Sequence, residues 1–129
     1  MERDMELVRE LLLKIADANE PLDFSDMVPG RTEGTKEYAL AAYHMQMLIE
    51  EAGLVRGIDA STMSGKDWIH LELTWFGQDF IESIRDPTVW DQTKEGAKKL
   101  GGVSWDILLG LAKAYVKAEA KKRLGIDLG

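Results

Sequence analysis

The sequence predicts a mainly α protein with a small antiparallel β-hairpin, in which a winged-helix-like domain is followed by C-terminal helices. Two long segments in the first half carry apolar side chains at helical spacing. An alternating segment that follows a Ser-Gly turn indicates a hairpin. Capping residues and glycines then delimit further helices. Helix, helix, hairpin, helix is the order of elements in a winged helix, a relative of the helix-turn-helix.

Two amphipathic helices are predicted in the N-terminal half. The first covers residues 3–18, where apolar side chains recur at spacings of three and four: Met5, Val8, Leu12 and Ile15. The second is capped by Thr35, runs to Ala52 and ends at Gly53. Its inward stripe is predicted to contain Tyr38, Ala41, Met45, Leu48, Ile49 and Ala52. The intermediate helix of a complete winged-helix motif has to lie within residues 23–28 or the following loop, where the pattern is weak.

A hairpin is predicted after the second helix. Its first arm, residues 55–60, has an odd apolar spacing that a bulge at Gly57 would accommodate. The second arm alternates strictly, which assigns to one face Trp68, His70, Glu72 and Thr74, and to the other Ile69, Leu71, Leu73 and Trp75. Residues 61–67 have turn chemistry. Trp68 is therefore expected on the outward face, and Met63 at the tip.

Further helices are predicted after the hairpin. Gly77 lies inside the first of them, which extends to Arg85, and implies a close packing contact at its backbone. Asp86-Pro87 begins a helix that runs to Leu100. Ser104 caps a last helix over residues 105–124, which Gly125 ends. We expect two parts: a winged-helix-like domain over residues 1–86, and a C-terminal helical extension over residues 87–129 packed on it.

Composition argues against several functional classes. The 129 residues are enough for one domain, and the absence of cysteine excludes disulfides, thiolate metal sites and thiol nucleophiles. No segment is typical of a secretory signal or a membrane-spanning helix, so we expect a cytoplasmic protein. A zinc site would need His44 on a helix and His70 on a hairpin arm, and no carboxylate spacing indicates a general acid and base. We expect no enzymatic activity, no cofactor and no metal.

The net charge of −7 is unevenly distributed. Residues 1–86 contain eight Lys and Arg against eighteen Asp and Glu, whereas residues 87–129 contain eight against five. Affinity for duplex DNA depends largely on Lys and Arg that neutralise phosphates. The acidic charge of the first part therefore disfavours DNA as its partner, although the second helix carries side chains of types that read base edges: Tyr43, His44 and Gln46.

Protein binding fits the remaining features better. The residues expected to bind a protein partner are Glu37, Tyr43, His44, Glu50, Glu51, Met63 and Trp68. The last helix is apolar over much of its circumference, which is typical of a helix buried on two sides. The second side is covered either by the preceding helix or by a second copy in a homodimer. The residues expected for self-association are Trp105, Leu108, Leu111 and Tyr115.

Four segments resemble a known family. They are RDMELVRELLLKI at residues 3–15, YHMQMLIEEAGLV at 43–55, LTWFGQDF at 73–80 and RDPTVW at 85–90. In this order they resemble the bacterial and phage family known as domain of unknown function 2513, over nearly the whole chain. The resemblance implies a prokaryotic or phage setting and a winged-helix-like fold. It implies no catalytic residues.

Two hypotheses follow for the function. The first is a non-enzymatic, protein-binding winged-helix protein of phage or prophage type. Its acidic face would bind a host complex, as an inhibitor or modulator of defence or nucleic-acid handling, because an acidic domain can occupy a basic groove. The anti-defence role is inferred from the setting and the charge. The alternative is a DNA-binding transcriptional regulator, dimeric through its C-terminal helices, that uses His44, Gln46 and the hairpin loop.

Overall fold

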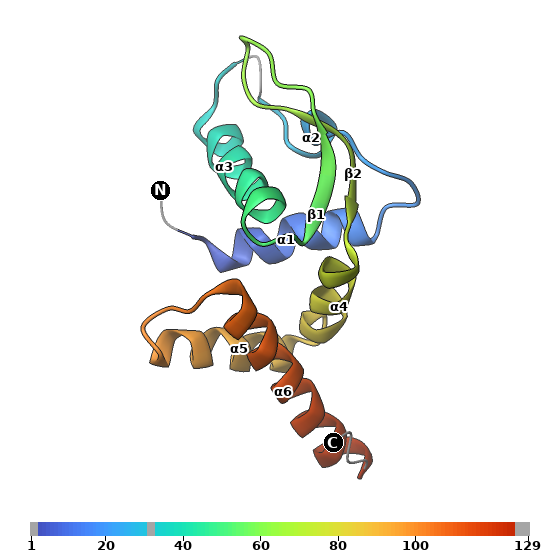
Figure 1. Ribbon diagram of the computed structural model, residues 1–129, viewed down its shortest axis with the longest axis vertical. Helices are drawn as coiled ribbons and strands as arrows, with labels where there is room; N and C mark the ends of the chain where they lie inside the picture. The colour runs from blue at the N-terminus through green and yellow to red at the C-terminus, as the bar shows by residue number, and fades with distance from the viewer. Residues whose placement is uncertain (1–2, 31–32, 126–129) are drawn as a thin grey trace. The chain divides into compact units, whose positions relative to one another are not determined.

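The structure is a computed structural model that describes residues 3–30 and 33–125 (Figure 1). Its elements are α1 (Met5–Ala16), α2 (Phe24–Met27), α3 (Lys36–Glu50), β1 (Val55–Asp59), β2 (Trp68–Leu73), α4 (Trp75–Ile84), α5 (Pro87–Lys99) and α6 (Trp105–Leu124). The two strands form an antiparallel hairpin. The predicted fold class, mainly α with a small β-hairpin and C-terminal helices, is confirmed.

The chain divides into two compact units. The N-terminal unit ends at Gln78 and the C-terminal unit begins at Asp79, so this division lies inside α4. The expected domain boundary after Asp86 and the expected packing of the extension on the first domain stay predictions. Each unit is described by itself below.

Side chains that cap the helices fix where most of them begin. The Asp4 carboxylate accepts hydrogen bonds from the backbone N–H groups of Glu6 and Leu7, at 3.0 and 3.2 Å. The predicted caps are confirmed as well, since side-chain oxygens of Thr35, Asp86 and Ser104 accept from backbone N–H groups at the starts of α3, α5 and α6. Such caps satisfy N–H groups that have no partner inside the helix.

The segment between α1 and α3 supplies both a short helix and a sheet contact. The weakly predicted intermediate helix is α2, a single turn. Just before it, Leu22 and Leu71 exchange two backbone hydrogen bonds, of 3.1 and 2.7 Å. On α2 the fully buried ring of Phe24 lies edge-on to those of Tyr38 and Trp68, with ring centroids 5.2 Å apart in both pairs. Phe24 therefore joins α2, α3 and β2 in one core.

A bulge interrupts the hairpin. Arg56 pairs with Glu72 and Ile58 with Ile69, so one residue of β1 faces two residues of β2 between these pairs. The bulge lies opposite Gly57, close to where the sequence suggested it, but the additional residue belongs to β2. His70, one of the two bulged residues, has a φ of 54°, in the left-handed region that bulges use.

This bulge overturns the predicted orientation of Trp68. Strict alternation placed Trp68 on the opposite face from Leu71 and Leu73. The additional residue shifts the alternation by one, so that all three side chains are buried, and Trp68 is only 4% exposed. The prediction that Trp68 lies outward on a binding surface was wrong for this reason.

Gly77 makes the predicted close contact. A Cβ atom at this position would lie 2.0 Å from the Leu54 carbonyl oxygen. The Thr74 hydroxyl donates to the Gly53 carbonyl at 2.6 Å and accepts from the Gly77 N–H at 3.1 Å. The end of the hairpin and the start of α4 are thus fastened to the turn that follows α3.

In the C-terminal unit, α5 covers one side of α6. Gly96 on α5 allows this approach, since a Cβ atom there would lie 2.6 Å from the Tyr115 hydroxyl oxygen. Phe80 and Trp105 are edge-on, with ring centroids 6.5 Å apart. Buried residues contributed by the two helices are Val89, Trp90, Thr93, Leu108, Ala112 and Glu119.

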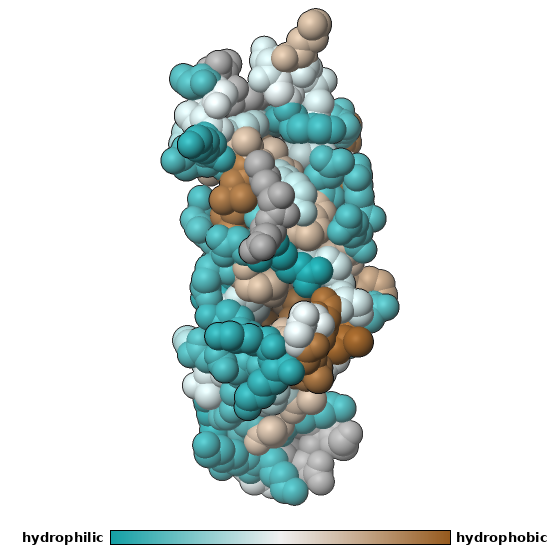
Figure 2. Space-filling model, turned by 90° about the vertical axis from the view of Figure 1, so that its left-hand side faces the viewer, coloured by the Kyte–Doolittle hydropathy of each residue, from teal (hydrophilic) through white to brown (hydrophobic). Residues whose placement is uncertain are grey.

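Most of the surface seen in Figure 2 is hydrophilic, with hydrophobic residues in smaller areas between the polar ones. The large apolar side chains that are exposed are Tyr43, Ile58, Met63, Trp75, Phe76, Leu100, Ile107 and Leu124. Within the described residues, no helix has the length and apolar character needed to cross a membrane.

Candidate protein-binding surfaces

Two grooves flank α3 in the N-terminal unit. Each has a volume of about 370 Å³. The first, named here the hairpin groove, lies between α3 and the hairpin loop and is lined by Gly34, Thr35, Tyr38, Ala39, Ala42, Tyr43, Gln46, Ser64, Gly65 and Lys66. The second, named the acidic groove, lies between α1, α3 and the segment after α2. Its lining residues are Asp4, Glu6, Leu7, Glu10, Leu11, Lys14, Met27, Val28, Pro29, Glu37, Leu40 and Ala41.

The hairpin groove is hollow because small residues line it. Ala39 and Ala42 on α3, with the glycines of the flanking loops, leave space beside the ring of Tyr43, which is 40% exposed. The hydroxyl of Tyr38 donates to the Lys66 carbonyl at 2.5 Å, which ties the hairpin loop to α3. Gln46 donates to Glu50 at 3.1 Å. The lining of the groove thus contains the rings of Tyr38 and Tyr43, the amide of Gln46 and the ammonium group of Lys66.

The acidic groove has an apolar floor and a charged rim. Half-buried Leu7 on α1, Val28 after α2 and Leu40 on α3 contribute apolar surface from three separate elements. Exposed carboxylates on the rim belong to Asp4, Glu6, Glu10 and Glu37. Lys14 is the one cation of the lining; it lies 3.6 Å from Glu10 and donates to the Met27 carbonyl at 3.4 Å.

His44 is a core residue, which corrects its assignment to a binding surface. It is fully buried, and its Nε2 accepts the Asp4 N–H at 2.7 Å. Nδ1 therefore carries the proton and donates to the Leu40 carbonyl at 2.8 Å. A buried imidazole is tolerated when both nitrogens are hydrogen-bonded. Neither nitrogen is available to a base edge, a protein partner or a metal without breaking one of these bonds.

The carboxylates near the hairpin are engaged locally. Buried Asp67 accepts from the backbone N–H groups of Ser25 and Trp68, at 3.2 and 2.9 Å. Glu72 pairs with Arg56 at 2.8 Å. Hydrogen bonds from Ser61 lower the pKa of Asp59. Within the described residues, no group of three or more His, Asp or Glu side chains is arranged to hold a metal ion.

The residues predicted to bind a protein are not brought together in one patch. Glu37 lies on the rim of the acidic groove, whereas Tyr43 lines the hairpin groove. Glu50 and Glu51 are exposed at the C-terminal end of α3, and Met63 is fully exposed in the hairpin loop. The sequence analysis missed the rim and floor that α1 contributes. The signal was present there, because Glu6 and Glu10 flank Leu7 at helical spacing.

The residues predicted for self-association are divided between the core and the surface. Leu108 is 1% exposed and belongs to the core, so its assignment to a contact between copies was wrong. The wide apolar arc of α6 is covered on this side within the chain itself. Trp105, Leu111 and Tyr115 are partly exposed, and their role in self-association stays a prediction.

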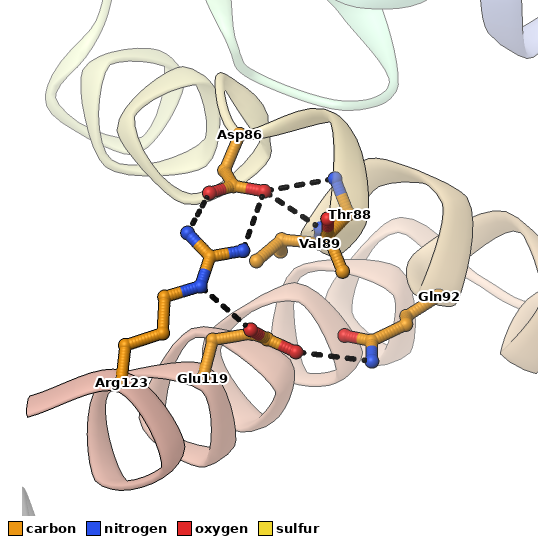
Figure 3. Close-up of polar contacts among 6 residues, drawn as sticks. All are labelled: Asp86, Thr88, Val89, Gln92, Glu119 and Arg123. Carbon is orange, nitrogen blue, oxygen red and sulfur yellow. Dashed lines mark hydrogen bonds and ion pairs between the residues drawn. The ribbon is translucent and has the colours of Figure 1, made fainter. Parts of the chain in front are cut away.

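Basic residues of α6 form ion pairs inside the C-terminal unit. Arg123 contacts Asp86 at 2.5 and 3.5 Å and Glu119 at 2.9 Å, and Gln92 donates to Glu119 at 3.4 Å (Figure 3). Lys113 pairs with Asp79 at 2.7 Å. The Arg123 hydrogen bond lowers the pKa of Asp86, and the same bond raises the pKa of Arg123. These contacts hold α6 against Asp79, Asp86 and Gln92, which precede it in the chain.

Comparisons with known proteins place the chain in a family. The DUF2513 family, described as a hypothetical protein family, matches residues 2–104. A protein of Haemophilus influenzae described as an uncharacterized protein is 32% identical over 117 residues, which cover 90% of this chain and 96% of that relative. No solved structure matches. The family resemblance of the four sequence segments is thereby confirmed.

Proposed function

The chain belongs to the DUF2513 family, and we propose that it binds a protein partner and catalyses no reaction. The observation that carries this proposal is the excess of exposed carboxylates over cations around α3, next to two grooves with apolar lining. The acids are Glu33, Glu37, Glu50 and Glu51. Among the residues that the structure describes, the exposed cations beside them are Lys36 and Lys66. A polyanion is repelled by this surface, whereas a basic protein surface is attracted.

The partner we propose is a host protein that presents a basic surface, such as one that handles nucleic acid. An acidic domain can occupy such a surface by electrostatic complementarity and block it. This fits an inhibitor or modulator of phage or prophage origin, the setting that the family resemblance implies. The proposed site of action is the cytoplasm, where such complexes work.

A second candidate function is DNA binding. The chain passes through α1, the Leu22 bridge to Leu71, α2, α3 and the hairpin, which is the order of a winged helix with α3 as the recognition helix. The specific observation in favour is that Tyr43, Gln46 and Lys66 line one groove between that helix and the hairpin loop. A regulator of this kind would be dimeric through α6. Against DNA binding, the described surface around α3 exposes four acids and two cations, whereas affinity for duplex DNA depends on cations that neutralise phosphates.

Salt-dependent binding to a short random DNA duplex separates the two candidates. A DNA binder should bind at low salt and lose affinity steeply as salt rises, because binding releases counterions from the phosphates. We expect no detectable binding even at low salt. Binding with a steep salt dependence would favour the regulator instead.

Affinity capture from a bacterial lysate tests the protein-binding proposal. We expect a captured partner whose complex with the chain is weakened by combined Glu50→Lys and Glu51→Lys substitutions. Asn19→Ala is the control for an exposed residue without charge. A complex that is unaffected by the charge reversals would contradict binding through the acidic face. Light scattering over micromolar concentrations determines in addition whether α6 makes a dimer.

A further inference from the structure

The acidic groove combines apolar surface with a lining that contains four carboxylates and one ammonium group. We propose that it binds a cationic amphipathic helix of the partner protein, with a large apolar side chain on the floor and Lys or Arg side chains against the rim. This inference rests on the proposed function and deepens it, because it names the surface and the class of partner segment. It places the contact on the α1 side of α3, away from the hairpin groove.

The shape of the groove suits an inserted side chain. Leu7, Val28 and Leu40 come from α1, the segment after α2 and α3, so the floor is held by three elements and is formed before a partner arrives. Its volume of about 370 Å³ lies at the lower end of the roughly 300–1,000 Å³ of small-molecule sites. That is room for a few side chains and not for a folded domain. A helix laid in the groove inserts apolar anchors at such positions.

The rim determines the sign of the partner's charge. Four carboxylates stand against the ammonium group of Lys14, which is already held by Glu10 and the Met27 carbonyl. Glu37 forms no ion pair with any residue that the structure describes. A Lys or Arg beside Glu37 would lie within the Debye length of about 8 Å at physiological salt, so the attraction survives screening. An anionic segment or a phosphate backbone is repelled by the same groups.

Synthetic helical peptides test the partner class directly. The probe is a fluorescently labelled leucine-lysine peptide with an amphipathic helical pattern, titrated with the full chain and followed by anisotropy. Two matched peptides serve as controls: one in which serine replaces leucine, and one in which glutamate replaces lysine. We expect measurable binding of the leucine-lysine peptide alone, weakening as salt rises. Equal binding of the serine-lysine peptide would overturn the proposal, because the apolar floor would then contribute nothing.

Paired charge reversals locate the contact on α3. Glu37→Lys alters the acidic groove, whereas Glu20→Lys makes the same charge change at an exposed position of the same unit that lines neither groove. We expect Glu37→Lys to weaken peptide binding about tenfold and Glu20→Lys to change it about twofold or less. Equal losses in the two variants would mean attraction to diffuse negative charge, and would overturn the groove as the site.

Two further variants address the floor. Leu40→Ser and Val28→Ser each remove apolar surface from a different element, and circular dichroism identifies any variant that no longer folds. We expect either folded variant to bind the leucine-lysine peptide several-fold more weakly, and unchanged affinity in both would overturn the apolar contact.

The occupant of the groove is tested separately. If the chain self-associates and Glu37→Lys abolishes this self-association, the occupant is the basic α6 of a second copy, and the proposal of a different partner protein is overturned. Absent peptide binding, together with a captured complex that the Glu50 and Glu51 reversals weaken, would refute the groove and leave the proposed function standing.

Discussion

The N-terminal and C-terminal units use charged residues in different ways. Residues 1–78 contain seven Lys and Arg against fifteen Asp and Glu, whereas residues 79–129 contain nine against eight. In the C-terminal unit, Arg123 and Lys113 pair with Asp86, Glu119 and Asp79, so charge serves to fasten α6. In the N-terminal unit acids outnumber cations, and Lys14 and Arg56 pair with Glu10 and Glu72. The excess of negative charge there acts on molecules that approach the surface.

The same contrast holds for apolar packing. In the N-terminal unit, aromatic rings from α2, α3 and β2 meet around Phe24. In the C-terminal unit, two helices approach each other at Gly96. The first unit is thus a small core built from distant segments, and the second is a contact between successive helices. Substitutions in the first should disturb more elements at once.

The largest effect is expected at the centre of the N-terminal core. Phe24→Ala should destabilise the chain by about 3–5 kcal/mol, because it empties a fully buried site that contacts two other aromatic rings. Urea unfolding followed by tryptophan fluorescence measures this, with Met63→Ala as the exposed control. If Phe24→Ala lowered the free energy of unfolding by less than Met63→Ala does, α2 would not belong to the cooperative core.

A pair of glycine substitutions compares the two units at matched positions in helices. Gly77→Ala should cost about 1–3 kcal/mol, because a Cβ atom would lie 2.0 Å from the Leu54 carbonyl oxygen and the backbone has to move. Gly110→Ala on α6 meets no atom within 4 Å and should stabilise by about 0.5–1 kcal/mol, since alanine is the better helix former. Thermal unfolding gives both values. The two substitutions should change stability in opposite directions. Stabilisation by both would contradict the close contact at Gly77.

The buried imidazole offers a smaller effect in the N-terminal unit. His44→Phe keeps an aromatic ring but leaves the Asp4 N–H and the Leu40 carbonyl without their partner, so a loss on the order of 1–2 kcal/mol is expected. Chemical denaturation measures it, with His70→Asn as the control, because asparagine tolerates the left-handed conformation at this bulge. If the loss at position 44 does not exceed that at position 70, the hydrogen bonds of His44 contribute no stability.

The smallest effect is expected for the exposed ion pair of the C-terminal unit. The Arg123 hydrogen bond lowers the pKa of Asp86 below its ordinary value of 3.8. Its contribution to stability is therefore complete above that value and disappears as the pH falls through the lower pKa of the folded state. Asp86→Asn keeps a good N-cap and removes the charge. The difference in Tm between the wild type and this variant should be constant near neutral pH and shrink below about pH 4, and a pH-independent difference would contradict the pair.

Local chemistry explains the helix ends that sequence analysis found. Thr35, Asp86 and Ser104 lie at the helix starts that the sequence predicted, because each satisfies N–H groups within three residues of itself. Gly125 ends α6 in the left-handed conformation, as expected. The single turn of α2 was predicted only weakly, within residues 23–28 or the following loop, because four residues are too few to display a helical period.

The candidate site was predicted less well. Glu37, Tyr43, Glu50, Glu51 and Met63 lie on the surface as expected, but the structure distributes them over different parts of it. Trp68 was misplaced because a single additional residue in β2 reverses the faces of a strand. Residue type suggested that His44 is polar and exposed, while its burial depends on two backbone groups, from Asp4 and Leu40, that no local pattern identifies.

The sequence by itself determined the helices, the hairpin, the acidic character of the first unit and the family, because caps, turns, periodicity and charge reside in neighbouring residues. Only the tertiary structure decided which side chains are inside and where the surface is hollow. The acidic groove exists because α1, α3 and the segment after α2 approach one another in space, with Leu7, Val28 and Leu40 between them. Such a convergence depends on how whole elements pack, a property that no stretch of sequence contains alone.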